Sequence, residues 1–161
     1  MTSSAPELDR SHSCPASAES LAGDLERIAT GAVALTTRAL AHADTGFELT
    51  FPQWRALLVL GESDDGARVG EVGARVGVTL PATGRLLRRL ERRGLTSLSV
   101  DEQDRRAIRA QLTERGRAAR ESILAHRRTA LVEIARSLGE TDRLQLTDGL
   151  RIIAAELGRF A

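Results

Sequence analysis

Cysteine and aromatic residues are scarce in this sequence. Cys14 is the single cysteine of the 161 residues, tyrosine is absent, and aromatic side chains make up only 2%. One cysteine excludes an intrachain disulfide, which agrees with a reducing cytoplasm. A core with so few rings must consist of Leu, Val, Ile and Ala, and we expect a mainly α-helical chain. Its length suffices for one compact domain, and 42% hydrophobic with 28% charged residues indicates a globular protein.

Long hydrophobic runs are also missing. The longest, residues 56–60, is far shorter than the roughly 20 residues that cross a bilayer. Charged residues and Pro6 occupy the stretch where a signal peptide would be apolar. We therefore expect a cytoplasmic protein without a membrane partner. Residues 1–16 are rich in Ser, Ala and Pro without periodicity, and we expect a flexible N-terminal tail there.

The sequence lacks the motifs of common catalytic and metal sites. It contains no Gly-rich phosphate loop and no serine or cysteine in a nucleophile motif. The residues His12, Cys14, His42 and His126 are scattered, and no two histidines have the i, i+4 spacing that places two ligands on one helix face. We therefore expect no cofactor, no metal and no enzymatic activity.

Lysine is absent, so all 23 basic residues are arginine, and their distribution is uneven. Residues 1–67 carry a net charge of −6, residues 68–128 carry +8, and residues 129–161 carry −1, which gives the net +1 of the whole chain. Phosphate binding depends on local rather than total charge. The basic block therefore points to nucleic acid as a partner, although solvated arginines on a helix remain an alternative.

Residues 69–93 predict two short helices joined by a tight turn. For the second helix, residues 80–93, Thr79 is a candidate N-cap, Pro81 suits the first turn, and Gly94 follows the end. The expected inner face consists of Thr83, Leu86, Leu87 and Leu90. The expected outer face consists of Pro81, Gly84, Arg85, Arg88 and Arg92. Such a helix can pack on a domain and also enter a DNA groove.

A β-hairpin is predicted after this helix. Leu95, Leu98 and Val100 lead into it, and apolar and polar residues alternate over residues 108–112, as in a half-buried strand. The charged tip, residues 101–106, ends in Asp104-Arg105-Arg106. An arginine there suits the narrow minor groove, and Asp104 is expected to pair with Arg106. The order of helix, turn, helix and hairpin predicts a winged helix-turn-helix, with a short strand near Arg68 and Val69 beside the wing.

These motifs resemble the MarR family of transcriptional regulators. The resemblance rests on Arg93-Gly94-Leu95, the Asp-Arg-Arg wing, the Leu-Thr-Glu-Arg-Gly run at 112–116, and the Leu-Thr-Phe-Pro-Gln-Trp run at 49–54. It implies that Asp104 braces Arg106 for the minor groove. Gly84 departs from the family pattern, which commonly has a small hydroxyl residue there. Peroxide-sensing relatives hold an N-terminal cysteine with tyrosines, so no such role is expected for Cys14.

Helices with apolar seams are predicted at both ends of the chain. They cover about residues 17–42, 113–138 and 141–157, and a further helix begins at Thr50 with a capping box to Gln53. The resemblance implies that the terminal helices form a dimer. We expect a tail at 1–16, a helical dimerisation region at 17–44 and 114–161, and a winged helix-turn-helix domain at 45–113.

The resulting hypothesis is a homodimeric regulator, implied by the resemblance to be a ligand-responsive repressor, which binds a palindromic operator in double-stranded DNA. The alternative is a helical interaction dimer whose winged domain no longer reads DNA. The predicted DNA-binding residues are Arg75, Thr79, Leu80, Pro81, Gly84, Arg85, Arg88, Asp104, Arg105 and Arg106. A pocket for a small-molecule effector is expected near Phe47, Trp54 and Arg55.

Overall fold

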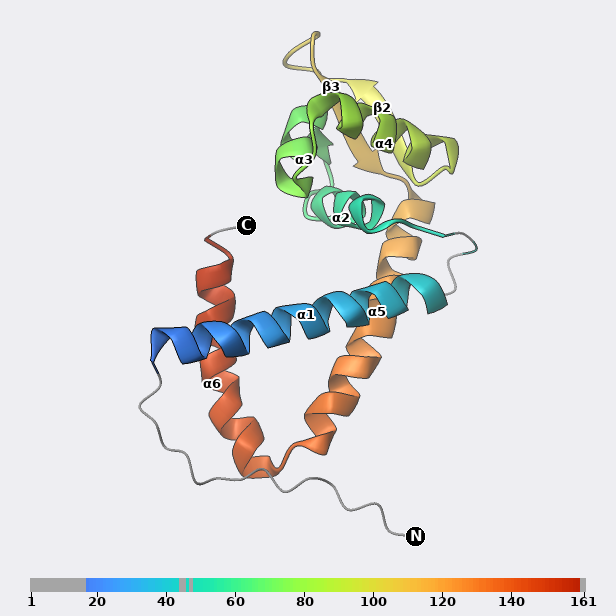
Figure 1. The fold of residues 1–161 in the computed structure, drawn as a ribbon. Helices are drawn as coiled ribbons and strands as arrows, with labels where there is room; N and C mark the ends of the chain where they lie inside the picture. The colour runs from blue at the N-terminus through green and yellow to red at the C-terminus, as the bar shows by residue number, and fades with distance from the viewer. Residues whose placement is uncertain (1–16, 44–45, 47, 160–161) are drawn as a thin grey trace. The chain divides into compact units, whose positions relative to one another are not determined.

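The computed structural model describes residues 17–43, 46 and 48–159. The predicted tail with Cys14 and the predicted pocket residue Phe47 lie outside these residues. The chain divides into two units after Ala34, and helix α1 spans their boundary. The elements of Figure 1 are α1 (Ala18–His42), α2 (Phe51–Leu60), β1 (Ala67–Arg68), α3 (Val69–Val76), α4 (Leu80–Arg92), β2 (Thr96–Val100), β3 (Ile108–Leu112), α5 (Glu114–Ser137) and α6 (Glu140–Leu157).

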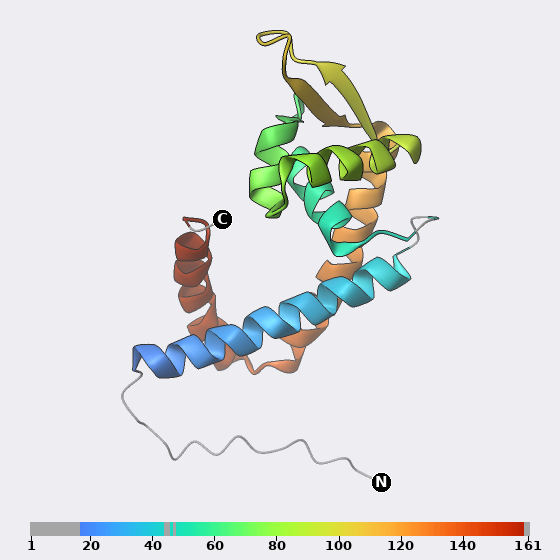
Figure 2. The ribbon, with the colours of Figure 1, turned by 45° about the horizontal axis from the view of Figure 1, so that its top comes forward.

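Elements α2 to β3 form the winged domain, as the sequence predicted. The sheet is antiparallel with strand order β1-β3-β2, so β3 is central. Ala110 of β3 lies opposite both Ala67 and Leu98. The hairpin of β2 and β3 is the wing, and Figure 2 shows it projecting beyond helices α3 and α4. The predicted short strand is β1, although Val69 already belongs to α3.

The core of this domain lies between α2, α4 and the inner part of the sheet. Trp54 and Leu57 of α2, Leu87 and Leu90 of α4, and Ala110 of β3 are almost completely buried. Ala119 and Ile123 of α5 belong to the same cluster. The outer part of the wing differs from the prediction, because the paired residues Val100 and Ile108 are exposed rather than half-buried.

Helix ends follow the predicted capping residues in most places. The Gln53 side chain accepts the backbone N–H of Thr50 at 3.0 Å, which completes one arm of the expected capping box. Gly94 has φ = 69°, and the N–H groups of Gly94 and Leu95 bond the carbonyls of Glu91 and Leu90 in a Schellman motif. Thr79 occupies the N-cap of α4, but its side chain makes no capping hydrogen bond.

The Leu-Thr-Glu-Arg-Gly run has a direct packing role. Thr113 caps α5 by accepting the N–H of Gly116 at 3.0 Å, and its hydroxyl donates to the Gly94 carbonyl at 2.6 Å. A Cβ at Gly116 would overlap the carbonyl oxygen of Leu95. The first turn of α5 therefore packs directly on the backbone that follows α4, and only glycine allows this approach.

The terminal helices keep large apolar side chains exposed. In α6 no residue is buried, and Leu144, Leu150 and Ile152 are among its exposed side chains. The second half of α5 exposes Leu131 and Ile134 in the same way. Among the described helices, none combines the length and the apolar character that a membrane crossing requires.

Candidate nucleic-acid interface

The outer face of α4 carries the side chains that the sequence predicted there. Leu87 and Leu90 hold the inner face in the core, whereas Arg85 and Arg88 are exposed. Leu80, at the start of the helix, leaves 61% of its surface exposed. Thr79, Pro81 and Arg92 are exposed on the same helix. This face therefore offers cations beside an apolar N-terminal turn.

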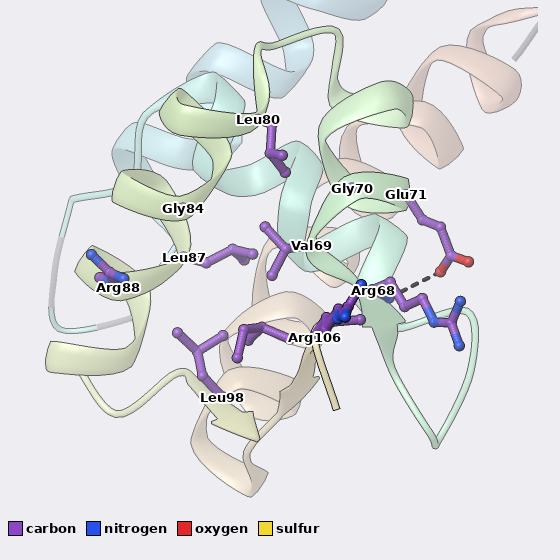
Figure 3. A pocket seen from close by; sticks show the side chains of 12 residues that line it. Arg68, Val69, Gly70, Glu71, Leu80, Gly84, Leu87, Arg88, Leu98 and Arg106 are labelled. Atoms are coloured by element: carbon purple, nitrogen blue, oxygen red, sulfur yellow. Dashed lines mark hydrogen bonds between the residues drawn. The ribbon is translucent and has the colours of Figure 1, made fainter. Parts of the chain in front are cut away.

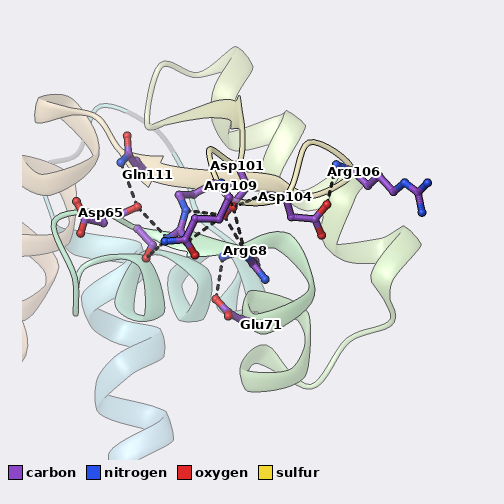
Figure 4. Close-up of polar contacts among 10 residues, drawn as sticks. Asp65, Arg68, Glu71, Asp101, Asp104, Arg106, Arg109 and Gln111 are labelled. Carbon is purple, nitrogen blue, oxygen red and sulfur yellow. Dashed lines mark hydrogen bonds and ion pairs between the residues drawn. The ribbon is translucent and has the colours of Figure 1, made fainter.

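The start of the wing tip is organised by Asp101, which sequence reasoning did not single out. Its carboxylate is only 2% exposed and accepts hydrogen bonds from Arg68 Nε and Nη2 at 3.1 Å and from Arg109 Nε at 3.0 Å. The backbone N–H groups of Gln103 and Asp104 donate to the same carboxylate. Figure 4 shows these donors converging on Asp101. One carboxylate thereby joins β1, β3 and the wing tip.

These contacts have an electrostatic consequence. The bonds from Arg68, then from the wing backbone and Arg109, hold the pKa of the Asp101 carboxyl well below its usual range, although burial opposes this. The need for a counter-charge here arises from the pairing of strands and not from the local sequence. Arg68 and Arg109 are direct neighbours on paired strands, and like charges in such positions require a counter-charge.

The predicted pair of Asp104 and Arg106 takes a different form. Asp104 Oδ1 accepts the backbone N–H of Arg106 at 3.0 Å rather than its guanidinium. In Figure 4 the Arg106 side chain points away from the Asp101 cluster. Both residues and Arg105 are exposed. Asp104 therefore shapes the turn and leaves the guanidinium of Arg106 available.

Arg75, predicted to contact phosphate, is engaged within the protein. Its guanidinium forms an ion pair with Glu62 at 2.7 Å, and this contact lowers the pKa of Glu62. The Arg75 side chain still leaves 43% of its surface exposed. The Glu62 turn partly neutralises this arginine, so its charge is less available than those of Arg85 and Arg88.

A groove of about 600 Å³ lies between α4 and the wing, and we call it the α4–wing groove. Figure 3 shows Leu87 of α4, Val69 of α3 and Leu98 of β2 converging in it. Its lining residues are Arg68, Val69, Gly70, Glu71, Leu80, Gly84, Leu87, Arg88, Leu98, Arg106, Ala107 and Ile108. The predicted residues Leu80, Gly84, Arg88 and Arg106 thus meet around one cavity, whose apolar floor no local sequence pattern indicated.

The residues predicted for an effector pocket lie elsewhere. Trp54 is 1% exposed and belongs to the core, whereas Arg55 is exposed and donates to the backbone carbonyl of Arg75 at 2.6 Å. A separate cavity of about 370 Å³ lies between the end of α1 and α5. Its lining includes Arg38, His126 and Glu133.

The three-stranded wing, the helix pair α3–α4 and the exposed outer face of α4 define a winged helix-turn-helix protein. Comparison with known proteins shows what this part of the chain resembles. The model of the MarR family matches residues 47–107, which include α2 to α4 and the wing tip. Over these residues the chain is similar to the MarR family, which agrees with the resemblance that its sequence predicted.

Individual relatives show the same similarity. The chain is 40% identical over 78 residues to the HTH-type transcriptional regulator TtmR of Methylorubrum extorquens, a match that covers 48% of this chain and 37% of TtmR. It spans 37% to 58% of the curated relatives that it matches. The crystal structure of RV1404 from Mycobacterium tuberculosis is 26% identical, with a TM-score of 0.75 over 89% of this chain and 97% of that one. CouR from Rhodococcus jostii, bound to p-coumaroyl-CoA, is also 26% identical, with a TM-score of 0.61 over 88% and 96%.

Proposed function

We propose that this protein is a cytoplasmic transcriptional regulator that binds double-stranded DNA as a homodimer. Helix α4 would lie in the major groove, and the wing tip would enter the flanking minor groove. The observation that carries the proposal is the exposure of Arg85 and Arg88 on α4 together with Arg106 on the wing. Arginine bonds guanine in the major groove and suits the negative potential of a narrow minor groove.

The dimer is supported by the apolar surface of the terminal helices. In α6, Leu144, Leu150, Ile152 and Leu157 are all exposed, although the helix spans 18 residues. Such a surface marks an interaction site in a water-soluble chain. A second copy of the same chain would cover it by two-fold symmetry, and two-fold symmetry in turn requires a palindromic operator with half-sites about one helical turn apart.

Repression relieved by a small molecule is a further part of the proposal. The relative CouR has p-coumaroyl-CoA bound. In this chain, the cavity between the end of α1 and α5 offers Arg38 and His126 beside the apolar Leu35 and Ile134. An effector there acts only if it binds the DNA-incompetent arrangement of the dimer more tightly than the competent one.

Selection from a randomised duplex pool tests the function. The full chain is incubated with the pool at two salt concentrations, and bound duplexes are sequenced. We expect a palindromic motif and a steep loss of affinity with salt, since each neutralised phosphate releases counterions. Salt-sensitive binding without a motif would indicate a phosphate binder without base readout. The absence of binding at low salt would refute DNA recognition and favour an interaction module.

A further inference from the structure

Gly84 occupies a position where the protein itself has no need of glycine. It is the fifth residue of α4, and a Cβ there would meet no atom within 4 Å. Alanine is intrinsically more favourable than glycine in a helix interior. Gly73, by contrast, faces the Thr83 side chain so closely that a Cβ would displace it. Gly84 therefore keeps open a space that the folded chain leaves unused.

That space is part of the α4–wing groove, and duplex geometry suggests its occupant. The major and minor grooves of DNA are separated by a single sugar–phosphate strand. If α4 occupies the major groove and the wing tip occupies the adjacent minor groove, that strand must pass between them. The α4–wing groove is the hollow at this position.

The lining of the groove matches the chemistry of a strand. Val69 and Leu98 supply an apolar floor, while Arg88 of α4 and Arg106 of the wing stand on opposite walls. Ile108 is a further apolar residue of the lining. Both arginines are exposed, and the ion pairs found among the described residues include neither of them.

The remaining charged groups of the groove are already engaged. Arg68 is held by Asp101, and Glu71 accepts the backbone N–H of Arg68 at 2.9 Å. This hydrogen bond keeps the carboxylate of Glu71, which would repel a phosphate, at the start of α3. Arg88 and Arg106 are the cations left for phosphate, one on each wall.

We propose that the α4–wing groove holds one DNA strand, with deoxyribose against its apolar floor and successive phosphates on Arg88 and Arg106, and that Gly84 leaves the room for this strand. The inference rests on the proposed function. It assigns to Gly84 a role in close approach, and it adds Val69, Leu98 and Ile108 to the residues that contact DNA.

A glycine series tests this role because stability and affinity should change in opposite directions. Gly84→Ala and Gly84→Leu are compared with Gly149→Ala, a helical glycine of α6 with open space around it in the single chain, and sedimentation checks that each variant keeps the assembly state of the wild type. The probe is the palindromic duplex recovered from the pool. We expect the thermal midpoint of Gly84→Ala to stay equal to that of the wild type or to rise by about 2 °C. We expect its affinity to fall roughly tenfold, with a larger loss for Gly84→Leu and none for Gly149→Ala.

Replacing single phosphates tests the position of the strand. A neutral methylphosphonate is introduced at one strand position at a time, and each duplex is titrated with wild type, Arg88→Ala and Arg106→Ala. At one position, we expect the neutral group to weaken duplex binding by the wild type but not by Arg106→Ala. At a neighbouring position, we expect it to weaken binding by the wild type but not by Arg88→Ala. If the wild type binds the unmodified duplex and both Gly84 variants bind it equally tightly, the inference is overturned. Failure of the wild type to bind any duplex would instead refute the proposed function.

Discussion

The contact between Gly116 and Leu95 allows a strong prediction about stability. A Cβ at position 116 would lie 2.9 Å from the Leu95 carbonyl carbon and closer still to its oxygen. Both partners are backbone, so no side chain can rotate away. In Gly116→Ala, the first turn of α5 must therefore move away from the end of α4. That movement stretches the bond from the Thr113 N–H to the Leu95 carbonyl, now 3.1 Å, and the bond from the Thr113 hydroxyl to Gly94.

The size of the effect follows from three contributions. Overpacking costs about 1–3 kcal/mol. Each of the two lost hydrogen bonds costs about 1 kcal/mol. The higher helix propensity of alanine returns about 1 kcal/mol. The free energy of unfolding should therefore fall by about 2–4 kcal/mol, which lowers the thermal midpoint of a chain of this length by roughly 10 °C.

Thermal unfolding followed by circular dichroism measures this change, with Gly149→Ala as the matched control. Gly149 is a helical glycine with open space around it, so alanine there should leave the midpoint equal or raise it slightly. If the midpoint of Gly116→Ala is equal to or above that of the wild type, α5 can move without a loss of stability, and the packing argument is wrong.

Three further predictions concern the wing, base reading and assembly. Asp101→Asn should lower the thermal midpoint, because it removes the charge that Arg68 and Arg109 share. The pKa of Asp101 is depressed in the folded state, so the stability that its charge provides is complete above about pH 5 and is lost as the pH falls below about 4. The thermal midpoints of the wild type and Asp101→Asn should therefore converge in acid. Arg85→Ala should cost about 1–3 kcal/mol of binding and relax preference at one base pair, whereas Arg106→Ala should weaken all duplexes similarly and reduce the salt slope by about 1; equal losses on every duplex for both variants would contradict the assignment of α4. Replacing Ile152 by serine should shift sedimentation toward the monomer at micromolar concentration, and a wild type that sediments as a monomer would contradict the dimer.

Local patterns in the sequence predicted the elements of the winged domain. Thr50 with Gln53, Gly94 after α4, and Thr113 before α5 all lie where the structure begins or ends a helix. These signals depend on neighbours within a few residues, and backbone chemistry decides them almost alone. The alternation of the wing was also correct for Ala110 and Leu112, which face the core.

Features that depend on distant residues were beyond such patterns. Asp101 collects bonds from Arg68, 33 positions away, and a pattern of nearby residues contains no trace of that partner. The same holds for Arg75, whose charge is shared with Glu62. Val100 and Ile108 fit the strand alternation, yet no element covers them at the outer end of the wing. Burial there depends on how far the hairpin extends beyond its supporting helices.

The burial of Trp54 has a spectroscopic consequence. It is the only tryptophan in a chain without tyrosine, and its ring is fully enclosed in the core of the winged domain. Intrinsic fluorescence therefore reports solvent entry into that core alone, whereas far-ultraviolet dichroism averages over every helix, including α6. Recording both signals during one denaturant titration would reveal, without any label, whether the terminal helices melt together with the winged domain or before it.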